Sequence, residues 1–325
     1  FLTAEKLRPG CACLQLARTE TLLHHQERAL YYLRLHLESK YRLAESDILL
    51  DPVLSELEKE TGWQQLWKEK EWYSEQDKML GEARFLLERG EIPDAMNLLN
   101  ALEKTGYRSA EAGFERGRVY ARMHNPKAAR KAFQEALKKD PKHIPTLEAL
   151  AELEMAENEA GLAIPLWNRL LRQDPAFFPA YLRRAVSFSK DGKLRAAIGD
   201  LDFFLSCFPE SDSVLYLKGK IYSEHGKHLD ALKALNKALE LSQNNAAYFL
   251  ERGKAYAATG THRYAYRDFA MALDLDPENG ETWYEKGKVA EKLGDNDEAC
   301  HAYRMAFSQG IHEAEELAGK LCKTP

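Results

Sequence analysis

The sequence has 325 residues, of which 45% are hydrophobic and 30% are charged, a composition typical of a folded protein. Lysine and arginine total 46 against 51 acidic residues, so the formal charge of −5 argues against general attraction to nucleic acid phosphates. The apolar runs, such as the one at 48–50, are far shorter than the roughly 20 residues that a membrane-spanning helix needs. We therefore expect neither a transmembrane segment nor a nucleic acid partner.

Residues 1–75 are expected to form divergent helical repeats with a tryptophan-rich segment. Repeat-like spacing near residues 10–43 is carried by Ala17, Ala29 and Leu33. Three of the five tryptophans then follow within ten residues: Trp63, Trp67 and Trp72. An exposed tryptophan cluster would suit a partner-binding patch. We favour the alternative that Trp63 and Trp67, one helical turn apart, are buried and join this front to the repeats that follow.

The segment 76–313 is an internal repeat with a period of about 34 residues. One column is alanine in every copy: Ala95, Ala129, Ala163, Ala197, Ala231, Ala265 and Ala299. A preceding column holds small residues that let two helix backbones approach closely: Gly117, Ala151, Ala185, Gly219, Gly253 and Gly287. Large side chains four residues after the alanine fill the space that the small residues leave: Phe133, Trp167, Leu201, Leu235, Phe269 and Tyr303.

Proline and glycine mark the expected helix ends in this region. Prolines that close most units prevent continuation of the helix before them: Pro141, Pro175, Pro209 and Pro277. Glycines fall between the two helices of a unit, where a left-handed turn is least costly for glycine: Gly192, Gly226, Gly260 and Gly294. Each unit is therefore predicted to be a helix-turn-helix hairpin.

On these residues the chain resembles the tetratricopeptide repeat family. Residues 110–143 match its pattern well, through Gly117, Tyr120, Ala129, Phe133, Ala136 and Pro141. The resemblance implies an all-α fold, a right-handed α-solenoid of stacked hairpins. Its seven units are expected at 76–109, 110–143, 144–177, 178–211, 212–245, 246–279 and 280–313. Glu154 and Ala290 replace the family's tyrosine and Gln243 a closing proline, so we expect less regular packing there.

Residues 314–325 are predicted to form a C-terminal capping helix, with Ala314, Leu317, Ala318 and Leu321 on its apolar face. Solenoids need a cap with a polar back to close the exposed end of the core. This end, with its Glu-Ala-rich helix and Cys322-Lys323, also resembles the ends of exported repeat proteins from the Bacteroidota.

No motif for catalysis or cofactor binding is present: we find no Gly-rich phosphate loop, Gly-x-Ser-x-Gly elbow or His-Glu-x-x-His sequence. Cys11-x-Cys13 lacks the usual spacing of zinc ligands, even with His24-His25 nearby. The five cysteines are odd in number and scattered, unlike a disulfide scaffold. Charged runs such as Glu285-Lys286 and Lys138-Lys139-Asp140 are expected to be solvated helix surface. We expect no metal, no cofactor and no catalytic residue.

The family resemblance implies a concave surface lined by the first helix of each unit, the usual binding surface of solenoids. Two columns on that face carry cations and aromatic rings, and we expect partner binding at Phe114, Arg118, Tyr216, Lys220, Lys254, Tyr284 and Lys288. Such a lining suits an extended peptide with carboxylates and apolar side chains. The alternative, that these lysines are ordinary solvated surface, has equal weight. No asparagine follows the small residue, so the repeats do not resemble those that hold chaperone tails.

These features favour a non-enzymatic scaffold or adaptor for a protein or extended peptide. From the resemblance to exported proteins we expect a periplasmic or outer-membrane-associated location, as an accessory subunit of a secretion or outer-membrane complex. One alternative is a cytoplasmic co-chaperone or regulatory adaptor, and another is the non-catalytic region of a larger enzyme. The sequence begins with Phe1 rather than Met, so we expect the native amino terminus to be missing, which leaves the compartment open.

Overall fold

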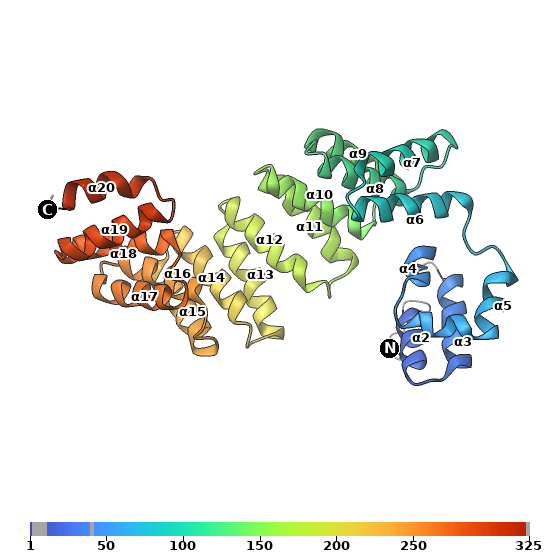
Figure 1. Cartoon of the computed structure of the whole chain (residues 1–325), viewed down its shortest axis with the longest axis horizontal. Coiled ribbons are helices and arrows are strands. Elements are labelled where there is room, and N and C mark those ends of the chain that lie inside the picture. Colours follow the sequence, from blue (N-terminus) through green and yellow to red (C-terminus); the bar gives the residue numbers. More distant parts are fainter. Residues whose placement is uncertain (2–11, 40–41, 323–325) are drawn as a thin grey trace. The chain divides into compact units, whose positions relative to one another are not determined.

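The computed structural model describes residues 1, 12–39 and 42–322, and within these ranges every regular element is a helix (Figure 1). The chain divides into two compact units, an N-terminal unit of residues 1–153 and a C-terminal unit of residues 154–325. Successive helices pair as antiparallel hairpins, in the register that the sequence repeat predicted. The all-α repeat fold predicted from the sequence is confirmed.

The N-terminal unit begins with the irregular front and continues into the regular hairpins. The front contains α2 (Cys13–Leu22), α3 (Gln26–Glu38), α4 (Glu45–Leu49), the 3-10 helix η1 (Leu54–Lys59) and α5 (Thr61–Glu69). The hairpins follow as α6 (Glu75–Glu88) with α7 (Ile92–Lys104) and α8 (Ala110–Arg122) with α9 (Pro126–Lys139). Helix α10 (Ile144–Ala156) starts in this unit and ends in the next.

The tryptophan-rich segment forms the core of the front. Trp63 and Trp72 are each 6% exposed, and Trp67 is partly buried against them. The Trp72 indole N–H donates to the Leu66 carbonyl oxygen at 2.8 Å, which satisfies its buried polar atom. The interpretation of these residues as buried core is therefore confirmed. The sequence led us to expect that Trp63 and Trp67 join the front to the repeats. All members of this core lie between Leu14 and Tyr73, so the tryptophans pack inside the front instead.

The front is tied to the hairpins by polar contacts. The Arg84 guanidinium on α6 lies 3.3 Å from an Asp47 carboxylate oxygen and 2.9 Å from one of Glu115 on α8. Arg42 donates to the Trp72 carbonyl oxygen and lies 3.8 Å from Asp77. Glu115 is only 1% exposed, so its ion pair with Arg84 gives this buried carboxylate the partner that it needs.

The C-terminal unit continues the same hairpin pattern. Its helices are α11 (Ala160–Gln173), α12 (Phe178–Lys190), α13 (Leu194–Cys207), α14 (Asp212–Glu224), α15 (His228–Leu241), α16 (Ala246–Ala258), α17 (His262–Leu275), α18 (Gly280–Leu293), α19 (Asn296–Ser308) and α20 (Glu313–Leu321). The even-numbered helices α12 to α18 are the first helices of their hairpins. Each packs against the second helix that follows it, and α14, α16 and α18 also contact one another in order.

The two predicted columns of small and large residues hold each hairpin together. The alanine column, from Ala95 to Ala299, is 0% exposed at every position. A Cβ added to Gly253 on α16 would lie 2.6 Å from the Phe269 ring on α17, which is closer than van der Waals contact allows. The glycine is therefore required by the approach of the ring, and Phe269 is itself fully buried.

The turn inside each hairpin repeats a left-handed backbone conformation once in every repeat. Gly192, Gly226, Gly260 and Gly294 have φ between 70° and 80°, as their positions predicted. His124 holds this turn in the N-terminal unit at φ 53°, and Asn158 holds it at the start of the C-terminal unit at φ 61°. Residues with a Cβ adopt this conformation at a cost, which asparagine bears better than histidine.

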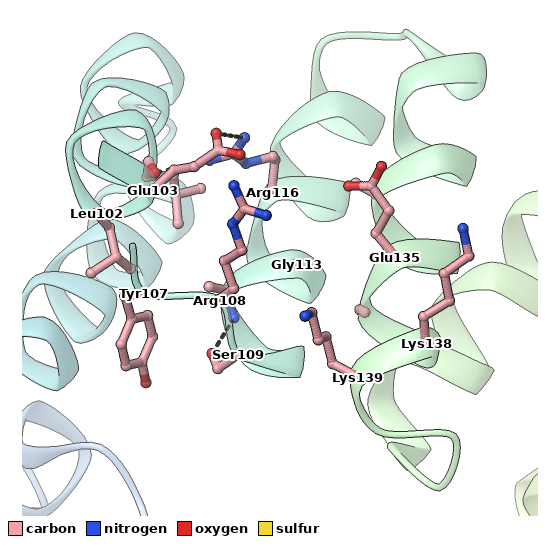
Figure 2. A pocket seen from close by; sticks show the side chains of 14 residues that line it. Leu102, Glu103, Tyr107, Arg108, Ser109, Gly113, Arg116, Glu135, Lys138 and Lys139 are labelled. Atoms are coloured by element: carbon pink, nitrogen blue, oxygen red, sulfur yellow. Dashed lines mark hydrogen bonds and ion pairs between the residues drawn. The ribbon is translucent and has the colours of Figure 1, made fainter. Parts of the chain in front are cut away.

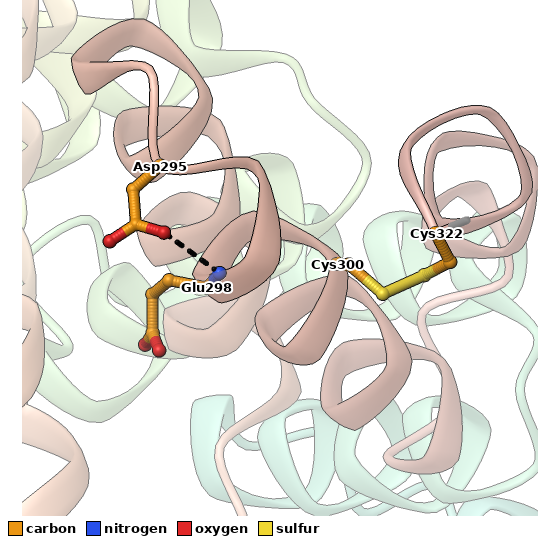
Figure 3. The surroundings of a disulfide bond; sticks show 4 residues. All are labelled: Asp295, Glu298, Cys300 and Cys322. Carbon is orange, nitrogen blue, oxygen red and sulfur yellow. Dashed lines mark hydrogen bonds between the residues drawn. A yellow bond between two sulfur atoms is a disulfide. The ribbon is translucent and has the colours of Figure 1, made fainter. Parts of the chain in front are cut away.

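The C-terminal cap is helix α20, whose Ala314 and Ala318 pack on the last hairpin. A disulfide joins Cys300 on α19 to Cys322, directly after α20 (Figure 3). At the start of α19, the Asp295 carboxylate accepts a hydrogen bond from the Glu298 backbone N–H at 3.1 Å, which caps this helix. The sequence analysis did not predict this disulfide.

Within residues 12–39 and 42–322, no helix has the length and apolarity needed to cross a bilayer. The same described residues contain no cluster of three or more histidine, cysteine, aspartate or glutamate side chains arranged to hold a metal ion. Cys13 is buried, whereas Cys11, the other member of the Cys-x-Cys sequence, lies outside the described residues.

Candidate functional site

The seven residues expected to bind a partner lie on first helices in both units. Phe114 and Arg118 are on α8 of the N-terminal unit. The other five, Tyr216, Lys220, Lys254, Tyr284 and Lys288, come from α14, α16 and α18 of the C-terminal unit. Because these three helices contact one another in order, the structure brings those five residues onto one continuous helical layer.

Two of the three lysines on this layer are already paired with carboxylates. The Lys254 ammonium donates to Glu281 at 2.6 Å and to Glu251 at 3.0 Å, which links α16 to α18. Burial lowers the pKa of Lys254, but the hydrogen bonds to the two glutamates outweigh it and raise the pKa above its ordinary value. Lys288 lies 2.9 Å from Glu285 one turn earlier on α18. The layer is therefore less basic than the lysines alone indicated.

Lys220 on α14 differs from these two lysines. It is half-buried, and no carboxylate among the described residues lies within ion-pair distance of it. Tyr216, one turn earlier on the same face, stacks on Tyr248 of α16 with ring centres 4.9 Å apart. An unpaired cation beside the partly exposed Tyr216 is the feature of this layer best suited to a carboxylate from another molecule.

The tyrosines on this layer are held in place by neighbouring helices. The Tyr248 hydroxyl donates to Asp212 at 3.1 Å, and burial together with this hydrogen bond raises the pKa of Tyr248 to about 12. Burial likewise raises the pKa of Tyr216. The Lys288 ammonium lies 5.3 Å from the centre of the Tyr284 ring, within the range of a cation–π contact. The Tyr216 and Tyr248 phenols therefore stay neutral near pH 7, and the partly exposed Tyr216 offers rigid contact area.

In the N-terminal unit the expected cation is neutralised. Arg118 lies 2.8 Å from the buried Glu115 carboxylate and 3.9 Å from Glu88. Phe114 packs against Phe133 and His143, with ring centres 6.1 Å and 5.6 Å away. These contacts fit a role in fixing α8, so the two residues carry less of the binding hypothesis than Lys220 does.

The sequence analysis missed a column of cations that lies directly before the small residues. The Arg184 guanidinium makes two hydrogen bonds to Asp200, at 2.6 and 2.7 Å, and one to Asn168 at 2.7 Å. Two repeats later, Arg252 contacts Asp268 and Asn236 in the same way. Each arginine thus ties its first helix to the second helices on both sides of it. The signal was the recurrence of a cation at one position of the repeat, together with an aspartate at a fixed spacing after it.

Lys286 belongs to this column, and its expected role as solvated surface was wrong. Its side chain is buried, and its ammonium lies 2.7 Å from Glu298 on α19. The rings of Tyr266 and Trp283 flank the ammonium at 5.0 and 5.1 Å. A buried cation needs such a carboxylate, so Lys286 holds the last hairpin together and is not free to bind a partner.

Three sequence-family models match parts of the chain. The description "Tetratricopeptide repeat" applies to residues 110–143 and 250–311, and the description "TPR repeat" to residues 219–260. No curated protein matches the chain in sequence. The family matches cover both structural units, since 110–143 lies in the N-terminal unit and the other two in the C-terminal unit.

Several solved structures share the fold. A tetratricopeptide repeat protein from Parabacteroides merdae is 17% identical, with a TM-score of 0.60 over 75% of this chain and 97% of its own. The C-terminal part of a TPR repeat-containing protein from Cytophaga hutchinsonii is 18% identical, with a TM-score of 0.61 over 75% of this chain and 100% of its own. PilW, a type IV pilus biogenesis factor, is 18% identical, with a TM-score of 0.53 over 65% of this chain and 97% of its own. At these identities the likeness concerns the fold.

Proposed function

The chain belongs to the tetratricopeptide repeat family, and from this premise we propose that it is a non-catalytic scaffold that binds an extended segment of a partner protein. The binding surface is the layer formed by α14, α16 and α18 in the C-terminal unit. The observation that carries this proposal is the unpaired Lys220, because the other lysines of the layer already have carboxylate partners.

The chemistry of the layer indicates what the partner's segment contains. A carboxylate of the segment would pair with Lys220, and an apolar or aromatic side chain next to it would lie on Tyr216, which the buried Tyr248 ring holds in place. The carboxylates of Glu251, Glu281 and Glu285 are already used by lysines. They therefore do not attract a basic segment as strongly as their number suggests.

Charge reversal at Lys220 tests the proposal. An array of short peptides that vary in acidic and aromatic residues would first identify a peptide bound by the protein, and fluorescence anisotropy would then measure its affinity. Lys220→Glu should weaken binding at least about tenfold, or about 1.4 kcal/mol, because an attraction becomes a repulsion. Lys237→Glu is the matched control, since Lys237 is an exposed lysine without an ion pair on α15, the second helix of the same hairpin. Equal affinities for the native protein and Lys220→Glu would refute the proposed surface.

We further propose that the chain works outside the cytoplasm, in the periplasm or at the outer membrane, as an accessory subunit of a secretion or outer-membrane complex. The Cys300–Cys322 disulfide supports an oxidising compartment, because such bonds are rare where glutathione and thioredoxin keep thiols reduced. PilW is an example of this fold in a type IV pilus biogenesis factor.

The oxidation state of the cysteines in intact cells tests the compartment. Cells that make the protein are treated with a membrane-permeant alkylating reagent before lysis, and the modified peptides are identified by mass spectrometry. Cys300 and Cys322 should resist alkylation, whereas the exposed, unpaired Cys207 should be alkylated and so reports that the reagent reached the protein. Full alkylation of all three would contradict an oxidising compartment and favour the cytoplasmic alternative.

A further inference from the structure

One first helix of the N-terminal unit lacks the large side chain that its repeat position otherwise carries. Four residues before the small-residue column, the other hairpins have large apolar side chains: Met79, Leu147, Tyr181, Leu215, Phe249 and Trp283. These fill the space between consecutive second helices, and Leu147 is 0% exposed. On α8 the position is Gly113. A Cβ there would lie 3.0 Å from the Ala136 Cβ and 3.2 Å from its Cα on α9, so even alanine would crowd that helix.

Gly113 lines a cavity of about 410 Å³ between α7, α8 and α9, which we name the α7–α9 pocket. Its floor is apolar and buried, formed by Leu99, Leu102, Ala132 and Ala136. The volume lies within the range of ligand-binding cavities in proteins. An apolar side chain bound in the pocket would cover this apolar floor.

The rim of the α7–α9 pocket is positively charged. Arg108 and Lys139 extend into it from opposite sides, Arg108 from the loop before α8 and Lys139 from α9 (Figure 2). Both are exposed, as is Lys138, and none of the three forms an ion pair among the described residues. Arg116 is paired with Glu103, and Glu135 is the remaining carboxylate of the lining. Four cations thus face two carboxylates.

A second cavity serves as an internal comparison. It measures about 430 Å³ and lies at the same place in the repeat between α13, α14 and α15. There Leu215 holds the position of Gly113, and two of the three rim lysines, Lys218 and Lys233, are paired with Asp202 and Asp230, which leaves Lys237. The α7–α9 pocket therefore differs from its counterpart by three unpaired rim cations, Arg108, Lys138 and Lys139, against the single Lys237.

We propose that the α7–α9 pocket binds a large apolar side chain, preferably aromatic, from an acidic segment of a partner protein. Five repeats later, Trp283 holds the position of Gly113, and its indole N–H donates to the Pro277 carbonyl oxygen at 2.8 Å. The residue that corresponds to Pro277 is Tyr107, which lines the α7–α9 pocket. The flanking carboxylates of the segment pair with Arg108 and Lys139.

This surface is distinct from the layer proposed above. On α8 the pocket uses Ala112, Gly113 and Arg116, whereas the sequence-predicted surface uses Phe114 and Arg118. With a rotation of about 100° per helical residue, the two sets face nearly opposite sides of α8. The protein therefore has a place for a second contact that leaves the first helices of the C-terminal unit free.

Binding of a designed peptide tests the proposal. The probe is a short fluorescein-labelled peptide with one central tryptophan flanked by aspartates and glutamates, measured by fluorescence anisotropy. Arg108→Glu/Lys139→Glu should reduce its affinity at least tenfold, and Ala132→Leu should do the same by filling the pocket. Leucine occurs at the same repeat position at Leu166, so this variant keeps the repeat pattern. Lys127→Glu/Lys131→Glu is the matched control, with the same charge change at exposed, unpaired positions of α9 outside the pocket.

The outcomes separate the pocket from general charge attraction and from the other surface. A peptide with alanine in place of tryptophan should bind at least tenfold more weakly, and Lys220→Glu should leave binding of the tryptophan peptide unchanged. Equal binding of the alanine and tryptophan peptides would leave only charge attraction and overturn the proposal. Equal loss in Lys127→Glu/Lys131→Glu, or no loss in Arg108→Glu/Lys139→Glu, would overturn it as well, since the charge reversals lie on exposed side chains that the fold does not require.

Discussion

Removal of the Cys300–Cys322 disulfide should loosen the C-terminal cap selectively. The two cysteines are 22 residues apart, and closing a loop of that length lowers the entropy of the unfolded chain by an amount worth about 3 kcal/mol at 25 °C. In a repeat protein each hairpin contacts only its neighbours, so this loss should fall on the last hairpin and α20. Cys322→Ser should therefore lower the protection of α20 amides against hydrogen exchange by about two orders of magnitude.

The assay is hydrogen exchange with mass spectrometry under native conditions, with and without a reducing agent. Reductant should reproduce the effect of Cys322→Ser in the native protein and should add nothing to the variant. Cys207→Ser is the matched control, because Cys207 is exposed and unpaired and its loss should leave α20 unchanged. If reduction, verified by thiol titration, left the exchange of α20 as it was, apolar packing of Ala314 and Ala318 alone would hold the cap, and the assigned role of the disulfide would be wrong.

Three further predictions concern single residues. His124→Gly should raise the free energy of unfolding by about 1 kcal/mol in urea denaturation, because His124 has a left-handed backbone that costs less for glycine; an unchanged midpoint would contradict this. Arg252→Met should lower the free energy of unfolding by about 3 kcal/mol, because the buried Asp268 loses its partner. Adding Asp268→Leu should recover most of this loss; a double variant as unstable as Arg252→Met would show that the ion pair is not the cause. The free energy of unfolding should fall as the pH rises from about 10 towards 12, because the unfolded chain loses the Tyr248 proton at a lower pH than the folded chain does. Tyr248→Phe should make this fall shallower when urea unfolding is measured across that pH range.

The columns that define the hairpins could be predicted from the sequence because they depend on contacts within one period of the repeat. Ala231 and its equivalents must be small wherever two helices meet, and Gly260 must turn left-handed, whatever lies further along the chain. Such requirements recur in each copy, so a single sequence contains seven observations of the same local geometry. The all-α repeat fold follows from them.

Contacts that depend on the stacking of neighbouring hairpins were not predictable in the same way. Lys254 belongs to the expected cationic column, but its partner Glu281 comes from the next hairpin. The sequence alone does not show which side chains of two stacked hairpins come within ion-pair distance. The burial of Lys286 has the same origin, since Tyr266 and Glu298 come from two different second helices. The α7–α9 pocket did leave a signal, the glycine at residue 113 in an otherwise large column, but its unpaired rim could be recognised only from the side-chain positions.

Hydrogen exchange, measured with and without the peptide selected on the array, tests most directly whether the first helices of the C-terminal unit hold the partner. The peptide chosen should be one whose affinity is unchanged by Arg108→Glu/Lys139→Glu, so that the α7–α9 pocket plays no part. Protection should appear over α14, α16 and α18 in the native protein and be lost with Lys220→Glu. Protection confined to the second helices α15, α17 and α19, or the same protection in Lys220→Glu, would contradict the proposed binding surface.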